Sequence, residues 1–170
     1  MRNIFVDGYN VINSWPELRD IKDYSFEAAR QKLIDYLQNY AAFKGYKIIL
    51  VFDAHMVSGS LQKKEKISEH LSVVYTKEGE TADTYIEKTI DSIGRKTEVC
   101  VVTSDSLEQQ LVFQRGAIRI SSLEFYFDVK ETENRISVKT QKKYSEKRHL
   151  LEDRIQKDVL EKLEKIRRSR

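Results

Sequence analysis

The chain has 170 residues, of which 40% are hydrophobic and 34% are charged, as in a globular protein with one compact domain. Its longest apolar run, Ile48–Phe52, is far shorter than the roughly 18 residues that a membrane-spanning helix needs. The single cysteine, Cys100, cannot form a disulfide within the chain, and its apolar surroundings predict a buried thiol. These features argue against a membrane-spanning or disulfide-stabilised protein, and we expect a cytoplasmic one.

The charge is divided unevenly along the chain. Residues 1–129 hold 16 Lys and Arg against 19 Asp and Glu, a net charge of −3, whereas residues 130–170 hold 14 against 8, a net charge of +6. We therefore predict a domain over 1–129 followed by a basic helical extension over 130–170. An acidic body with a basic tail suggests a polyanionic partner, but a solvated helix with internal ion pairs explains the charge equally well.

Apolar runs predict five strands, at residues 3–7, 47–53, 71–75, 98–102 and 117–120. Between them, helical periodicity predicts helices over about 26–44, 81–93 and 107–115, the first capped by Ser25 and ended by Gly45. Residues 7–10 suggest a turn, and residues 57–70 show no periodicity. Beyond Ser121 the pattern is helical, with a break predicted near Tyr144 and Ser145. Continuously apolar strands that alternate with helices indicate a parallel sheet covered on both faces.

Aspartates follow the strands at one edge of this predicted sheet. Asp7, Asp53 and Asp105 each end a strand, and Asp83 lies in the first turn of a helix, beside Glu80. One such aspartate is usually a helix cap or a turn residue. Several aspartates at one edge suggest a ligand-binding site, because ligands of parallel α/β sheets bind beyond the carboxyl ends of the strands. Clustered carboxylates also repel one another unless a cation neutralises them.

Oxygen ligands favour Mg²⁺ or Mn²⁺, and the histidines and the cysteine show no zinc-ligand spacing. Such a metal site typically polarises a phosphodiester and activates a water molecule for in-line attack. Asn10 follows Asp7 by three residues and is a candidate to orient a carboxylate or a phosphate, with ordinary turn chemistry as the alternative. Thr103 and Ser104 are candidate donors to Asp105 or to a phosphate, with helix capping as the alternative.

Basic and aromatic residues give candidate RNA contacts. Lys63 and Lys64 are predicted in a loop beyond the second strand, where they would either guide a phosphate backbone or be solvated. Four basic residues near the predicted helix break are candidates for a second RNA-binding patch: Lys142, Lys143, Lys147 and Arg148. Tyr9 and Trp15 are candidates for stacking on bases, although core packing is favoured for Trp15.

Four blocks of the sequence resemble the signature of NYN-domain nucleases, and most closely that of the YacP-like family of bacterial ribosome-associated endoribonucleases. They are Asp7-Gly8-Tyr9-Asn10-Val11-Ile12, Val51-Phe52-Asp53-Ala54-His55, Glu80-Thr81-Ala82-Asp83 and Thr103-Ser104-Asp105. Each block alone is weakly specific, but four in this order, at these spacings, make a strong resemblance that spans almost the whole chain.

The resemblance implies a PIN-like three-layer α/β/α sandwich with strand order 3-2-1-4-5, in which the strands that end in Asp7 and Asp105 are neighbours. It implies metal-binding roles for Asp7, Asp83 and Asp105, with Asn10 also in the catalytic set and Asp53 in an outer role. It does not decide whether Glu80 touches metal. The implied activity is cleavage of mRNA engaged with the ribosome.

Two other classes of protein compete with a nuclease. One is an RNA- or ribosome-binding PIN-like protein with little catalysis, which would have no need of clustered carboxylates beside a polyanion. The other is a receiver-type α/β protein, which usually needs a lysine at a later strand end, where this sequence has Ile118-Arg119-Ile120-Ser121. The sequence therefore favours a metal-dependent endoribonuclease.

Overall fold

The computed structural model describes residues 2–54, 61–93, 97–104, 116–152 and 157–168. Its residues divide into two compact units, 1–132 and 133–170, and each unit is described by itself. The first unit contains the sheet and the helices that pack on it. The second consists of the remainder of a long helix, α6 (Ser122–Glu152), and of α7 (Lys157–Arg168). None of the helices in the described ranges is long and apolar enough to cross a membrane.

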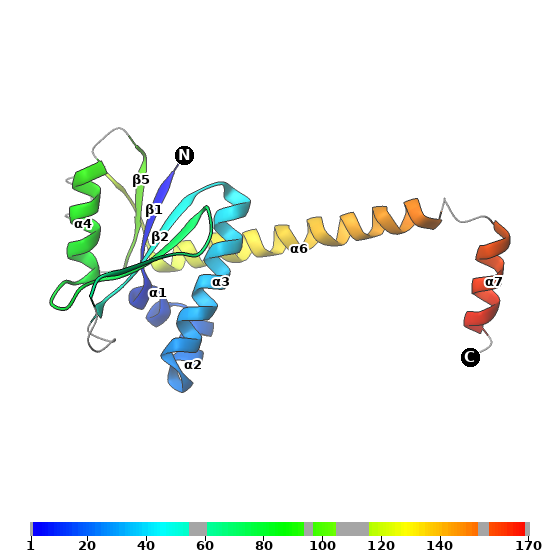
Figure 1. Cartoon of the computed structure of the whole chain (residues 1–170), viewed down its shortest axis with the longest axis horizontal. Helices are drawn as coiled ribbons and strands as arrows, with labels where there is room; N and C mark the ends of the chain where they lie inside the picture. Colours follow the sequence, from blue (N-terminus) through cyan, green and yellow to red (C-terminus); the bar gives the residue numbers. More distant parts are fainter. Residues whose placement is uncertain (1, 55–60, 94–96, 105–115, 153–156, 169–170) are drawn as a thin grey trace. The chain divides into compact units, whose positions relative to one another are not determined.

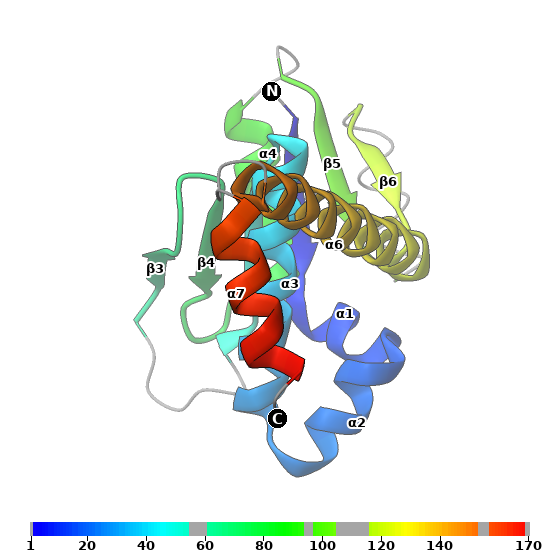
Figure 2. The same ribbon diagram turned by 90° about the vertical axis from the view of Figure 1, so that its right-hand side faces the viewer.

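The first unit is built on a six-stranded sheet with the order β3-β4-β2-β1-β5-β6. Five strands are parallel, as predicted: β1 (Asn3–Asp7), β2 (Lys47–Phe52), β4 (Leu71–Tyr75), β5 (Val99–Val102) and β6 (Ile118–Ile120). Their order is the predicted 3-2-1-4-5, with the first and fourth predicted strands, β1 and β5, side by side. Figure 2 shows β3 and β4 toward one edge of the sheet and β6 at the other.

The sixth strand corrects the sequence-based prediction. Residues 63–66, expected in a loop, form β3 (Lys63–Lys66), which pairs antiparallel with β4 at the edge of the sheet. Its Lys-Lys-Glu-Lys sequence has no apolar face, so hydrophobic periodicity could not predict it. The strand forms through backbone pairing with β4, and exposed lysines on an edge strand discourage pairing with a further chain.

Helices cover both faces of the sheet (Figure 1), and two clusters of buried side chains fill the space between the layers. Alternate residues of β1 point to opposite faces: Ile4 and Val6 belong to one cluster and Phe5 to the other. The larger cluster lies beneath α1 (Gly8–Ser14), α2 (Pro16–Tyr24), α3 (Phe26–Lys44) and the start of α6. The smaller cluster lies beneath α4 (Ala82–Ile93). These three layers confirm the predicted α/β/α sandwich.

Local signals explain where several helices begin and end. The Ser25 side chain caps α3 by accepting a hydrogen bond from the Ala28 N–H (3.2 Å), and Gly45 ends this helix in the left-handed conformation, with φ 69°. Ser121 and Glu124 form a reciprocal capping box at the start of α6, because each side chain accepts from the other residue's N–H.

Two helical predictions need correction. Residues 8–10 are the first turn of α1 rather than an isolated turn, and Asp7 is the N-cap of this helix. The break predicted near Tyr144 and Ser145 is absent, because α6 continues to Glu152. The Ser145 hydroxyl donates within the helix to the Lys142 carbonyl (2.9 Å), so it does not break the backbone pattern. The helix predicted over 107–115 lies outside the described residues.

Two predictions about single residues are confirmed. Cys100 is a buried free cysteine in the centre of β5, and burial raises the pKa of its thiol. Trp15 is fully buried between α1 and α2, and its indole N–H donates to the Ser122 carbonyl (2.8 Å). Trp15 is therefore a core residue, and its hydrogen bond links α1 to the start of α6. Because it is fully buried, it is not available to stack on a base.

Candidate active site

A cleft of about 390 Å³ opens at the carboxyl edge of the sheet. Three of the predicted aspartates line it: Asp7 at the end of β1, Asp53 just after β2, and Asp83 in the first turn of α4. Asn10 from α1 lines the same cleft. Strand pairing explains why the first two aspartates lie together, since β1 and β2 are parallel neighbours, with Asp7 in register with Val51. The fold thus brings Asp7 and Asp83, which are 76 positions apart in the sequence, to the lining of one cleft.

The electrostatic state of Asp7 reflects its burial first and the neighbouring carboxylates second. Burial raises the pKa of the Asp7 carboxyl to about 6; the backbone N–H of Asn10 opposes the rise, and the carboxylates of Asp83 and Asp53 add to it. The Asn10 N–H donates to Asp7 Oδ1 at 3.2 Å, which is the N-cap bond of α1. Asp7 therefore has two functions in one side chain: it caps a helix, and it presents negative charge to the cleft.

The chemistry of these donors fits a hard divalent cation, because carboxylate oxygens are the ligands that Mg²⁺ and Mn²⁺ prefer. Mutual repulsion among the carboxylates would be relieved by such an ion. Within the described ranges, no three His, Cys, Asp or Glu side chains come together as a metal-binding group. Asp105, the third predicted ligand, and His55 both lie outside those ranges.

Asn10 connects the cleft to distant parts of the chain. Its side-chain oxygen accepts a hydrogen bond from the Ser104 N–H (3.0 Å) and another from the Ser122 hydroxyl (2.7 Å). Ser104 directly precedes Asp105 in the sequence, so Asn10 fixes the backbone that leads into this aspartate. This bonding gives Asn10 a positioning role that differs from ordinary turn chemistry.

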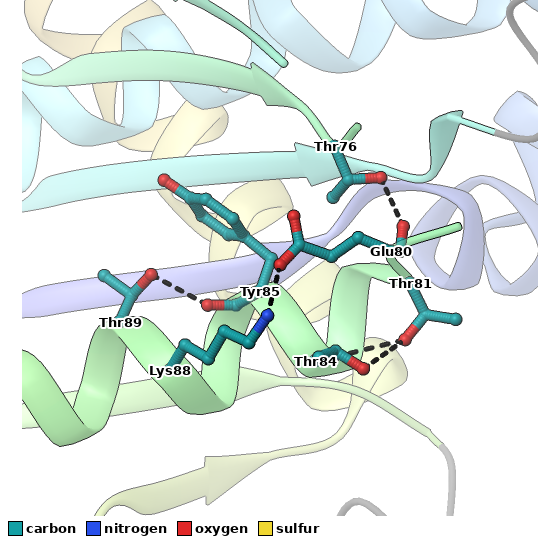
Figure 3. A network of polar contacts seen from close by, with 7 residues as sticks. All are labelled: Thr76, Glu80, Thr81, Thr84, Tyr85, Lys88 and Thr89. Carbon is teal, nitrogen blue, oxygen red and sulfur yellow. Dashed lines mark hydrogen bonds and ion pairs between the residues drawn. The ribbon is translucent and has the colours of Figure 1, made fainter. Parts of the chain in front are cut away.

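Glu80 is not among the described residues that line the cleft. It is buried, and its carboxylate forms an ion pair with Nζ of Lys88 on α4 (2.8 Å; Figure 3). Thr81 lines the cleft instead, and its hydroxyl caps α4 by accepting from the Thr84 N–H (3.2 Å). In the described geometry, Glu80 therefore helps to anchor the start of α4.

Thr76 joins two of the acidic segments through a fully buried hydroxyl. The hydroxyl accepts from the Ala54 N–H (3.0 Å), next to Asp53, and donates to the Glu80 carbonyl (2.6 Å), three residues before Asp83 (Figure 3). Neither backbone group is close to bulk solvent. Thr76 is therefore a brace that holds the segments bearing Asp53 and Asp83 against each other.

Replacing this hydroxyl should cost stability. Thr76→Val keeps the shape of the side chain but leaves the Ala54 N–H and the Glu80 carbonyl without their partner, so we expect a loss of roughly 2 kcal/mol or more in the free energy of unfolding. Thr89→Val is a matched control, since the Thr89 hydroxyl bonds only to the Tyr85 carbonyl within α4. Urea denaturation measures both variants. An equal and small loss of unfolding free energy in the two variants would show that the Thr76 hydroxyl does not stabilise the contact between these segments.

The predicted RNA-binding lysines lie in two different places. Lys63 pairs with Tyr75 across the β3–β4 ladder, at the same edge of the sheet as Asp53, and it forms an ion pair with Glu65. Lys64 follows it, and both side chains are exposed. The other four basic residues are exposed on α6, within the second unit: Lys142, Lys143, Lys147 and Arg148.

A mostly parallel α/β/α sandwich with carboxylates in a cleft at its carboxyl edge defines a PIN-like class of protein, and comparison with known proteins narrows that class. A family model described as the YacP-like NYN domain matches residues 4–168. The Bacillus subtilis (strain 168) protein YacP, described as uncharacterized, is 43% identical over 145 residues, which cover 85% of this chain and 84% of that protein. The chain therefore belongs to the YacP-like NYN domain family.

Solved structures agree with this assignment. The crystal structure of Rae1 (YacP) from Bacillus subtilis matches with a TM-score of 0.77 and 40% sequence identity, over 99% of this chain and 95% of that one. A variant of the same protein matches with a TM-score of 0.74 and 39% identity, over 86% of each chain. The NYN domain is nuclease-like, so membership of the family supports a role in RNA processing or binding at this general level.

Proposed function

We propose that this protein is an endoribonuclease that depends on a divalent metal and cleaves mRNA by attack of water on a phosphodiester. The observation that carries the proposal is the cleft at the carboxyl edge of a nuclease-like fold, which is lined by Asp7, Asp53 and Asp83. Similarity to the YacP-like family supports it further. We also propose that the mRNA is engaged with the ribosome, which would place the enzyme in the cytoplasm.

In this proposal Asp7, Asp83 and Asp105 hold Mg²⁺ or Mn²⁺. When bound there, such an ion polarises a phosphodiester and lowers the pKa of a coordinated water. Other residues of the chain position these carboxylates. Asn10 holds the backbone before Asp105, the Asn10 N–H orients the Asp7 carboxylate, and Thr76 joins the segments of Asp53 and Asp83. Asp53 lies in the same cleft in an outer role.

Cleavage of a labelled RNA tests the proposal. We expect Mn²⁺ or Mg²⁺ to support cleavage and a chelator to abolish it, whereas a PIN-like protein that only binds RNA or the ribosome would leave the RNA intact under both conditions. Mapping the cleavage sites on an mRNA, with and without translating ribosomes, then tests the proposed substrate. Cleavage that is independent of ribosomes would overturn that part of the proposal.

The ends of the products report the mechanism. We expect water to be the nucleophile, because the sequence shows no paired histidines to activate the ribose 2′-hydroxyl. Attack by water should leave a 5′-phosphate and a 3′-hydroxyl. End-group analysis of the products distinguishes the two routes. Recovery of a 2′,3′-cyclic phosphate would rule out water as the nucleophile.

The basic segment 130–170 is proposed to position the nuclease on RNA. Replacing Lys142, Lys143, Lys147 and Arg148 with glutamine should weaken co-sedimentation with ribosomes and flatten its salt dependence, by about one unit of log–log slope for each phosphate that is no longer neutralised. Replacing four exposed basic residues outside this segment, Arg19, Lys32, Lys47 and Lys77, with glutamine is the control for charge alone. If the α6 variant sediments like the wild type at every salt concentration, the segment is not a docking element.

A further inference from the structure

The cleft is lined by aromatic side chains as well as by acidic ones. Besides the aspartates, its lining includes Tyr9 and Asn13 from α1, and Phe26, the first residue of α3. The two rings meet edge to face, with centroids 5.9 Å apart and an interplanar angle of 78°. Metal binding alone does not require aromatic side chains, so it does not explain this part of the lining.

The two rings are held differently. Tyr9 is fixed on several sides: it packs edge-on against Phe52 (5.2 Å between centroids), and its hydroxyl accepts from Arg30 Nη1 (3.3 Å). Phe26 is half-buried and belongs to neither of the two core clusters of the described chain. A large apolar side chain that lies outside the core and lines a cleft is suited to contact a ligand.

Positive charge accompanies the aromatic side chains of the lining. Lys22 Nζ lies 5.9 Å from the centroid of the Phe26 ring and donates to the Asn13 side-chain oxygen (2.8 Å). With Arg30 at the Tyr9 hydroxyl, two cationic side chains flank the rings, and these rings line the same cleft as the carboxylates. The two cations are suited to contact a backbone phosphate of an RNA strand bound in the cleft.

We propose that Phe26, Tyr9 and Asn13 form a subsite for one unpaired nucleobase of single-stranded RNA, next to the phosphodiester that is cleaved. The proposal rests on the nuclease function above and extends it to substrate selection. Unpaired bases stack on aromatic side chains, and a cleft of about 390 Å³ is in the range of pockets that enclose a small ligand. A paired base is already stacked within its helix, so the subsite selects single strands.

The test pairs a change in the protein with a change in the RNA. The substrates are a single-stranded oligoribonucleotide and a series in which one nucleotide near the mapped cleavage site is abasic. In the wild type, the abasic residue that falls at the subsite should lower kcat/KM about tenfold. Phe26→Ala should lower kcat/KM for the intact RNA by a similar factor. With the abasic RNA, kcat/KM of this variant should fall no further, because the substitution has already removed the ring on which the base stacks.

Two variants control for other effects of the substitution. Phe26→Tyr keeps an aromatic face and should restore most of the activity. Tyr24→Ala removes an aromatic ring two residues away that is 93% exposed and does not line the cleft, and it should behave like the wild type with every substrate. Mn²⁺ affinity should be the same in Phe26→Ala as in the wild type, which shows that the acidic lining is intact.

The outcomes separate this inference from the function on which it rests. If the wild type cleaves RNA, but Phe26→Ala suffers the same abasic penalties as the wild type at every position, the base subsite is refuted and the nuclease stands. If the wild type cleaves no RNA, the nuclease fails. Fluorescence anisotropy with the same oligonucleotides and variants then decides whether the subsite binds a base, and equal affinities throughout would refute it as well.

Discussion

Asp7→Asn is expected to abolish most RNA cleavage while making the metal-free protein more stable at neutral pH. The loss of a charged metal ligand should lower the cleavage rate by roughly two orders of magnitude or more. The fold should survive, because asparagine is as good an N-cap as aspartate and can accept the same hydrogen bond from the Asn10 N–H.

The gain in stability follows from the raised pKa of Asp7. Its pKa of about 6 in the folded protein, against an ordinary value of 3.8, means that ionisation of Asp7 opposes folding. Stability therefore falls as the pH rises from about 4 to about 6 and then stays level, at a cost of at most about 3 kcal/mol. The substituted side chain in Asp7→Asn carries no charge, so the variant should exceed the wild type in stability above pH 6, and the difference should vanish near pH 4.

Denaturation in the presence of a chelator, at pH 4 and pH 8, measures this difference, and labelled RNA measures cleavage. Asp20→Asn, at an exposed position on α2, is the control and should change neither property. Wild-type cleavage by Asp7→Asn would remove Asp7 from the metal site. A metal-free variant that is less stable than the wild type at pH 8 would contradict the raised pKa of Asp7.

Gly8→Ala should be among the most destabilising single substitutions at the site. Alanine normally stabilises a helix by about 1 kcal/mol relative to glycine. Here a Cβ atom would lie 2.3 Å from Phe52 Cε1, and that ring is fully buried, stacked on Tyr75 and packed against Tyr9. We expect a loss of about 3 kcal/mol in the free energy of unfolding, from steric strain in a packed core.

A double-substitution cycle isolates this contact. Phe52→Leu removes Cε1 and Cζ, two of the three ring atoms that the new Cβ would meet, so Gly8→Ala should cost less in the Phe52→Leu background than in the wild type. Thermal or urea denaturation of the four proteins gives the coupling energy. An equal cost in both backgrounds would mean that the ring is not what excludes a side chain at position 8. The result matters for the site, because Gly8 and Phe52 are the direct neighbours of Asp7 and Asp53.

The sequence predicted the parts of the fold that depend on local signals. Apolar runs located the parallel strands, and Ser25 and Gly45 marked the ends of α3 correctly, since an N-cap side chain and a left-handed glycine act within one turn of the helix. Pro16 is a comparable local signal, because proline suits the first turn of a helix and α2 begins there.

Other features depend on pairing across the chain, which no local pattern encodes. The β3 strand forms because β4 offers an unpaired edge, and its own residues give no sign of it. The bonds of Asn10 to Ser104 and Ser122 join residues 94 and 112 positions apart, so the positioning role of Asn10 appears only in the folded chain. The same is true of the buried hydroxyl of Thr76, which joins the segments of Asp53 and Asp83.

Cation binding at the cleft carboxylates is the central claim, and titration calorimetry with Mn²⁺ tests it most directly. The wild type should bind Mn²⁺, Asp83→Asn should bind it more than about tenfold more weakly because a charged oxygen ligand is removed, and Asp91→Asn should bind it like the wild type. Equal Mn²⁺ affinity in all three proteins, or no binding by the wild type, would contradict the account.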